Sequence, residues 1–97
     1  MIRGTTPLHT FTIPFDTGLI DKARVIYSQN GQPVLKKDNC TLDGNYIKVK
    51  LTQEDTLSFT ASYPVDIQVR VVLHDGEALV SSINKVSVEK CLENEVL

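Results

Sequence analysis

The sequence predicts an all-β fold, an antiparallel β-sandwich of about seven strands. Two observations predict it. Apolar and polar residues alternate along most of the 97-residue chain, which is the period of a half-buried strand. Turn signals separate the alternating segments at intervals of roughly ten residues, and no segment has the pattern of a long helix or a βαβ unit.

The N-terminal part of the chain predicts three extended segments. Residues 10–15 and 22–28 both alternate, and the second segment gives Tyr27 the parity of a core residue. Asn30-Gly31 then predicts a type I′ hairpin turn, because both residues tolerate a positive φ. The return strand is expected over residues 33–37, where the leading proline favours a sheet edge. The inward residues of the first two segments are Phe11, Ile13, Phe15, Ala23, Val25 and Tyr27.

The middle of the chain predicts a second hairpin and a helical turn. Residues 40–42 lead into the tight turn Asp43-Gly44-Asn45, and residues 46–51 form the strand after it. Its inward residues are Ile47, Val49 and Leu51. The run from Thr52 to Asp55 resembles a capping box, so one helical turn is expected there. Residues 57–60 alternate again, which predicts that the chain returns to an extended form at once.

The longest strand is predicted over residues 65–74. Its odd-numbered residues from Val65 to Leu73 are all apolar and are expected to face the core. Asp75-Gly76 turns the chain back into a last strand over residues 78–89. The apolar parity changes along that strand, which predicts a β-bulge near Asn84-Lys85.

Seven short strands separated by tight turns favour an immunoglobulin-like sandwich. We expect one domain over residues 1–90 and a frayed tail over residues 91–97, because the tail has no period. The net charge of −2 and the scattered basic residues argue against nucleic-acid binding. The first residues lack the apolar stretch of a signal peptide, and no segment is long and apolar enough for a membrane span, so we expect a cytoplasmic protein.

The residue types of an active site are present, but not in a spacing that builds one. His74 is expected to be solvated at a hairpin end, and His9 is expected to be a strand-edge residue. No close Cys or His pair suggests a metal site, and ordinary turn chemistry is the better account of Asp16 and Asp21. No catalytic residue, cofactor or metal ligand is therefore assigned.

The two cysteines leave two alternatives open. Without a secretory signal, Cys40 and Cys91 are expected to be free thiols, while the alternative is one disulfide between a mid-chain strand and the tail.

A second alternative concerns function. Tyr46 and Tyr63 are candidates for exposed aromatic platforms, so a carbohydrate- or cell-surface-binding module stays open.

Three stretches of the chain carry a resemblance, and together they span most of it. They resemble small uncharacterised proteins encoded by phages and prophages of Firmicutes, and are more loosely similar to the N-terminal β-sandwich of phage baseplate upper proteins. A baseplate upper protein continues into a long stalk, whereas this sequence ends at Leu97. The stretches are Thr10-Phe11-Thr12-Ile13-Pro14-Phe15-Asp16-Thr17, residues 42–59 and residues 65–88.

The resemblance implies a non-enzymatic structural or assembly module that acts through protein–protein contacts. Its partners are then other virion proteins or further copies of itself in a homo-oligomer, with no nucleic acid or membrane. It is expected in the host bacterial cytoplasm during assembly and afterwards in the virion. The candidate interaction face is the outward side of the longest strand, which mixes polar and apolar residues, and an ordinary solvated face is the alternative interpretation of the same residues: Gln68, Arg70, Val72 and His74.

Overall fold

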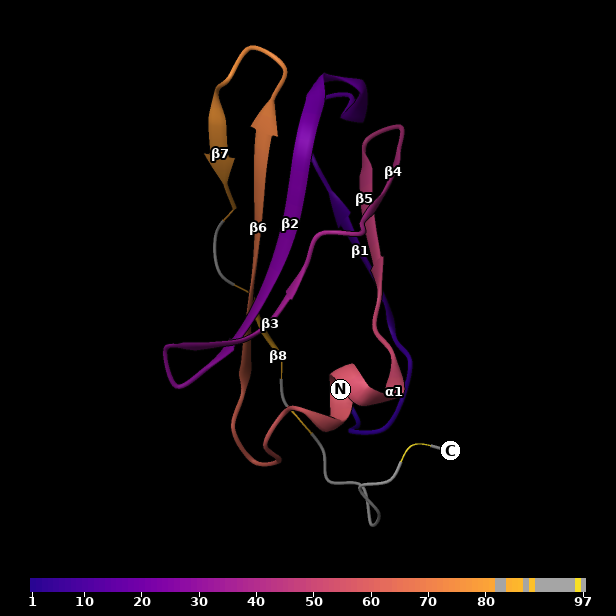
Figure 1. The fold of residues 1–97 in the computed structure, drawn as a ribbon, viewed down its shortest axis with the longest axis vertical. Coiled ribbons are helices and arrows are strands. Elements are labelled where there is room, and N and C mark those ends of the chain that lie inside the picture. Colours follow the sequence, from indigo (N-terminus) through magenta and orange to yellow (C-terminus); the bar gives the residue numbers. More distant parts are fainter. Residues whose placement is uncertain (82–83, 87, 89–95, 97) are drawn as a thin grey trace.

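Two antiparallel sheets form the protein, and a short helix lies at one end beside the N-terminus (Figure 1). The structure is a computed structural model that describes residues 1–81, 84–86, 88 and 96. The smaller sheet has the order β1-β5-β4, and the larger one has the order β3-β2-β6-β7, with β8 also paired to β6. The elements are β1 Leu8–Thr12, η1 Thr17–Leu19 (a 3₁₀ turn), β2 Ile20–Gln29, β3 Gln32–Lys37, β4 Thr41–Asp43, β5 Tyr46–Lys50, α1 Gln53–Leu57, β6 Val65–Leu73, β7 Ala78–Val80 and β8 Asn84–Val86.

The inner faces of the two sheets share one hydrophobic core, which confirms the prediction from alternation. On β6 the odd-numbered residues from Val65 to Val71 are buried, and Leu73 is half-buried at the end of the strand. They pack in one cluster with residues from β2 and β5. Phe11, Ile13 and Phe15 are only half-buried against this cluster. The residues buried from β2 and from the segment of β5 are Ile20, Val25, Tyr27, Ile47, Val49 and Leu51.

The predicted β2–β3 hairpin is confirmed, with its two-residue turn at Asn30-Gly31. The φ angles of 52° and 74° are both positive, as a type I′ turn requires. Gln29 and Gln32 face each other across this turn, and β3 forms an edge of the larger sheet, as its proline suggests. The register shifts next to Ser28, so one extra residue bulges from β3.

The single helical turn predicted at the capping box is confirmed, but the extended chain predicted over residues 57–60 is wrong, because Leu57 still belongs to the helix and a turn follows it. The side chain of Thr52 accepts the backbone N–H of Asp55, and the Asp55 carboxylate accepts the backbone N–H of Thr52. This box starts α1, which continues to Leu57, and the chain then turns. Phe59 still reaches the core with 1 % exposure, but from a turn and not from a strand.

The last predicted strand is divided into β7 and β8, which follow one another along the same edge of β6. Val80 pairs with Arg70, and Asn84 pairs with Ile67. Val80 and Asn84 are four residues apart in the sequence, whereas their partners on β6 are three residues apart. A one-residue shift of register is therefore present, as the change of parity predicts. It lies between Val80 and Asn84, upstream of the predicted position, because Asn84 and Lys85 already pair regularly.

The strand order does not confirm an immunoglobulin-like topology. In an immunoglobulin constant domain the second strand lies between the first and the fifth. Here β2 lies between β3 and β6, and β1 pairs directly with β5. What the structure shows is the coarser class, an all-β arrangement of two antiparallel sheets.

Within the described residues, no helix has the length and apolarity needed to cross a bilayer.

Two predictions about the ends and boundaries of the chain are not tested by this structure. The expected tail over residues 91–97 lies outside the described residues except for Val96. The boundary of the domain at residue 90 stays a prediction.

Candidate functional site

The predicted interaction face lies on the outer side of the larger sheet, and three of its four residues come together there. Gln68, Arg70 and Val72 alternate with the buried residues of β6, so their side chains point away from the core. Arg70 is exposed, and the other two are half-buried. His74 lies beyond the strand in the following turn, where its Nδ1 is 3.8 Å from an Asp21 carboxylate oxygen. The expected hairpin-end position of His74 is confirmed.

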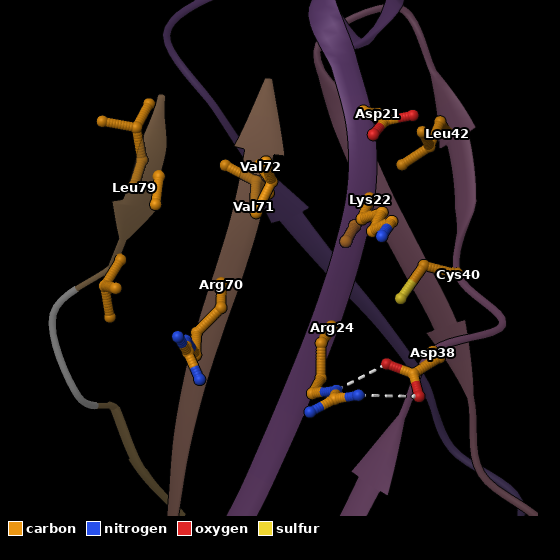
Figure 2. A pocket seen from close by; sticks show the side chains of 13 residues that line it. Asp21, Lys22, Arg24, Asp38, Cys40, Leu42, Arg70, Val71, Val72 and Leu79 are labelled. Carbon is orange, nitrogen blue, oxygen red and sulfur yellow. Dashed lines mark hydrogen bonds and ion pairs between the residues drawn. The ribbon is translucent and has the colours of Figure 1, made fainter. Parts of the chain in front are cut away.

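Arg70 and Val72 line a cleft of about 590 Å³ that crosses β2, β6 and β7 (Figure 2). Lys22 and Arg24 contribute from β2, and Val80, which is 54 % exposed, contributes from β7. The lining therefore combines three cationic side chains, the carboxylates of Asp21 and Asp38, and apolar side chains from β4, β6 and β7. The sequence pattern identified the β6 residues but missed the β2 residues beside them, because the pairing of β2 with β6 joins segments far apart in the chain.

The charges in this cleft are only partly compensated. Arg24 donates from Nε and a terminal nitrogen to the two carboxylate oxygens of Asp38, at 2.6 and 3.3 Å (Figure 2). These hydrogen bonds raise the pKa of Arg24 and lower the pKa of Asp38. Arg70 lies directly opposite Arg24 in the strand register. Within the part of the chain that the structure describes, Arg70 has no ion pair.

A second polar group lies inside the sandwich, where it serves the fold. Nδ1 of His9 is 2.7 Å from the Tyr27 hydroxyl. Burial lowers the pKa of His9, and burial with the nearby Cys40 and Asp55 raises the pKa of Tyr27. His9 does lie on an edge strand, as expected, but its ring faces inward and is half-buried. His9 has the same parity on β1 as Phe11, and this shared parity could have predicted that the His9 ring faces inward.

Cys40 is a free thiol, which agrees with the first of the two cysteine alternatives, while Cys91 lies outside the described residues. Its Sγ donates to the carbonyl of Lys37 at 3.6 Å and is half-buried. Burial raises the pKa of the Cys40 thiol, so it is protonated at neutral pH. A nucleophilic cysteine needs the opposite shift, and this environment does not supply it.

The acidic residues considered for a cation take structural roles. The Asp16 carboxylate accepts the backbone N–H of Gly18 at 2.7 Å and caps η1, which confirms the interpretation as turn chemistry. Asp21 lies on β2 and faces His74. Among the residues whose placement is described, no three His, Cys, Asp or Glu side chains gather as metal ligands would.

Tyr46 and Tyr63 are both exposed, at 45 % and 47 %, but they do not form a shared platform. Tyr46 begins β5, beside the β4–β5 turn, while Tyr63 precedes β6 at the end where α1 lies (Figure 1). The two rings are therefore at opposite ends of a molecule about 46 Å long. One sugar cannot stack on both.

No protein-family model, curated protein or solved structure matches this chain. The resemblance to phage and prophage proteins therefore stays a prediction.

Proposed function

We propose that the protein is a non-enzymatic structural or assembly module of a phage or prophage, acting through protein–protein contacts on the outer face of its larger sheet. The observation that carries the proposal is the position of Arg70, an exposed cation without an ion pair in the described part of the chain, beside the exposed Val80. Apolar groups with arginine among them are the composition of a protein interface.

The opposition of Arg24 and Arg70 supports the same proposal. Like charges directly opposite on neighbouring strands are unfavourable in an isolated sheet, and Asp38 already accepts both of its hydrogen bonds from Arg24. A carboxylate from a partner would relieve this repulsion with bidentate geometry. The cleft thus fits a protein surface that presents an acidic side chain within an apolar patch.

In this proposal the partners are other virion proteins, or further copies of the chain. The protein is present in the host bacterial cytoplasm during assembly and then in the virion. The net charge of −2 gives no electrostatic attraction to nucleic acid. The contacts are therefore expected to be with protein.

The test is to identify the genes beside its own and to co-express this chain with their products. We expect capsid or tail genes there, and we expect affinity purification to recover one of their products with the chain. Arg70→Glu should weaken that complex by about tenfold or more. Lys50→Glu is the matched control, because Lys50 is exposed on β5 of the other sheet.

Two results would contradict the proposal. One is a chain that purifies alone and monomeric beside every neighbouring gene product. The other is a complex that Arg70→Glu and Lys50→Glu weaken equally, since the outer face of β6 would then have no part in it.

A further inference from the structure

The two sheets are unequal in width, and the difference leaves a groove along one side of the sandwich. The smaller sheet has three strand positions and the larger one has four. An apolar groove of about 530 Å³ lies between β1, the edge of the smaller sheet, and the β6–β7 side of the larger one. Phe11, Phe15 and Leu79 face this groove and stay half-buried, although each packs against the core.

The backbone of β1 at this groove is unpaired on its outer side. The N–H of Leu51 donates to the carbonyl of Pro7, and the N–H of Ile13 donates to the carbonyl of Asn45. In an antiparallel ladder such bonded pairs recur at every second residue. Leu8, Thr10 and Thr12 therefore direct their N–H and C=O groups away from β5. No backbone partner for these three residues lies within the described chain.

The other sheet edges carry features that oppose pairing with another chain, and β1 does not. Edge strands are commonly protected by proline, by charge, by a bulge or by short length. The β3 edge has Pro33, two lysines and a bulge, while β4 and β7 are three residues long. β1 has five residues without proline or charge, and its Leu8 is 59 % exposed. It is the unprotected edge among the described strands.

We propose that this edge and groove bind one extended segment of a partner protein, which adds to the smaller sheet as a fourth strand next to β1. The segment is uncharged and has apolar residues at alternate positions. Its backbone pairs with Leu8, Thr10 and Thr12, and its apolar side chains fill the groove against Phe11 and Leu79. This is strand addition, in which backbone bonds give affinity and alternate side chains give specificity.

The difference in width between the two sheets favours a single segment over a second copy of the protein as the occupant of the groove. The larger sheet exceeds the smaller one by one position, and the half-exposed Leu79 marks β7 as the uncovered strand. Two copies joined through β1 would each bring a larger sheet to the same side, so their β7 strands would compete for one space. The proposal goes beyond the outer-face function, because its backbone pairing is with β1, which does not line the outer-face cleft, although Val71, Leu79 and Val80 line both cavities.

The test uses the purified full chain to select binders from a displayed random library of short peptides. We expect enriched peptides to share apolar residues at alternate positions. Thr10→Pro should weaken a synthetic enriched peptide by about tenfold or more, because proline removes the outward N–H and leaves the bonds to β5 intact. Thr10→Val, which keeps the N–H and a β-branched side chain, should bind like the original. Thr12→Pro removes the next outward N–H and serves if Thr10→Pro does not fold.

Each remaining outcome decides against the proposal. A library that yields no alternating apolar peptides overturns it, and so does an affinity that both proline variants leave unchanged. Sedimentation that shows a dimer lost on Thr10→Pro would assign the edge to a second copy instead. Arg70→Glu should leave peptide binding unchanged, so that failure of this inference and failure of the outer-face proposal give different results.

Discussion

Nδ1 of His9 lies 2.7 Å from the hydroxyl of Tyr27, and this contact joins β1 of the smaller sheet to β2 of the larger one. The Tyr27 ring is fully buried and lies between two other rings, His9 at 5.6 Å and Phe59 at 5.8 Å between centroids. A buried hydroxyl needs a partner, because an unmade hydrogen bond in the interior is costly. The pair therefore restricts how the two sheets lie on each other.

Tyr27→Phe should lower the free energy of unfolding by about 1 kcal/mol, because it removes the hydroxyl and leaves Nδ1 of His9 without its partner. Urea unfolding followed by circular dichroism measures this. Tyr63→Phe is the control, since the Tyr63 ring is exposed and its change should stay within about 0.5 kcal/mol. Equal effects at both positions would mean that the hydroxyl bond contributes nothing of its own.

The stability of the protein should fall in mildly acidic solution because of His9. Burial, with a smaller contribution from the positive amino terminus, lowers the pKa of His9 in the folded protein. The unfolded chain, with a histidine pKa of about 6.5, binds the proton first as the pH falls. Stability is thus complete above about pH 6.5 and decreases from there towards the lowered pKa of the folded state.

His9→Gln should flatten this dependence between about pH 7 and about pH 5, where few carboxylates titrate. Urea midpoints at both ends of that range, for the original chain and the variant, provide the measurement. If the variant loses as much stability as the original, another group is responsible.

Gln29 should be a large contributor to stability for a polar residue, because its amide makes three hydrogen bonds to one loop. It is 7 % exposed, donates to the carbonyls of Thr60 and Tyr63, and accepts the N–H of Thr60, at 2.9 to 3.1 Å. Gln29→Ala should cost about 2 kcal/mol of unfolding free energy, because buried backbone groups lose their partners. Gln32→Ala, at an exposed position past the turn, should cost less than about 0.5 kcal/mol.

The capping box of α1 gives a further prediction. Thr52→Ala should cost about 1 kcal/mol, because the side chain of Thr52 accepts the N–H of Asp55 at 3.1 Å. Thr60→Ala replaces an exposed threonine beyond the other end of α1 and should have little effect. A scan of thermal unfolding compares the two. A loss of similar size in both variants would show that the cap is not what the first substitution removes.

The alternation of residues was sufficient to predict the strands that have one buried face. On β5 and β6 the apolar residues hold their parity without interruption, so a slip of one residue would expose the whole set. The turn at Asn30-Gly31 was equally predictable, because the backbone there needs positive φ at two successive residues. Local chemistry fixed both features, and no distant residue was needed.

The errors arose where distant or competing interactions decide the structure. Leu57 and Phe59 have the spacing of a strand, but the cap at Thr52 had already started a helix that ends at Leu57. Whether β2 joins β1 or β6 depends on pairing between strands about forty residues apart, which alternation does not encode. The cleft around Arg70 and the open edge of β1 both follow from that pairing, and therefore neither was predictable in full.

The strand order also has a consequence for the sequence of events as the chain emerges from the ribosome. β1 is made first, yet its only partner in the described chain is β5, and β2 must wait for β6. The β2–β3 hairpin is the first pairing along the chain that joins two consecutive strands of the larger sheet. Because closing a long loop costs entropy before any contact repays it, we expect this hairpin to be the nascent chain's earliest structure. The N-terminal strand then docks only after the middle of the protein has been synthesised.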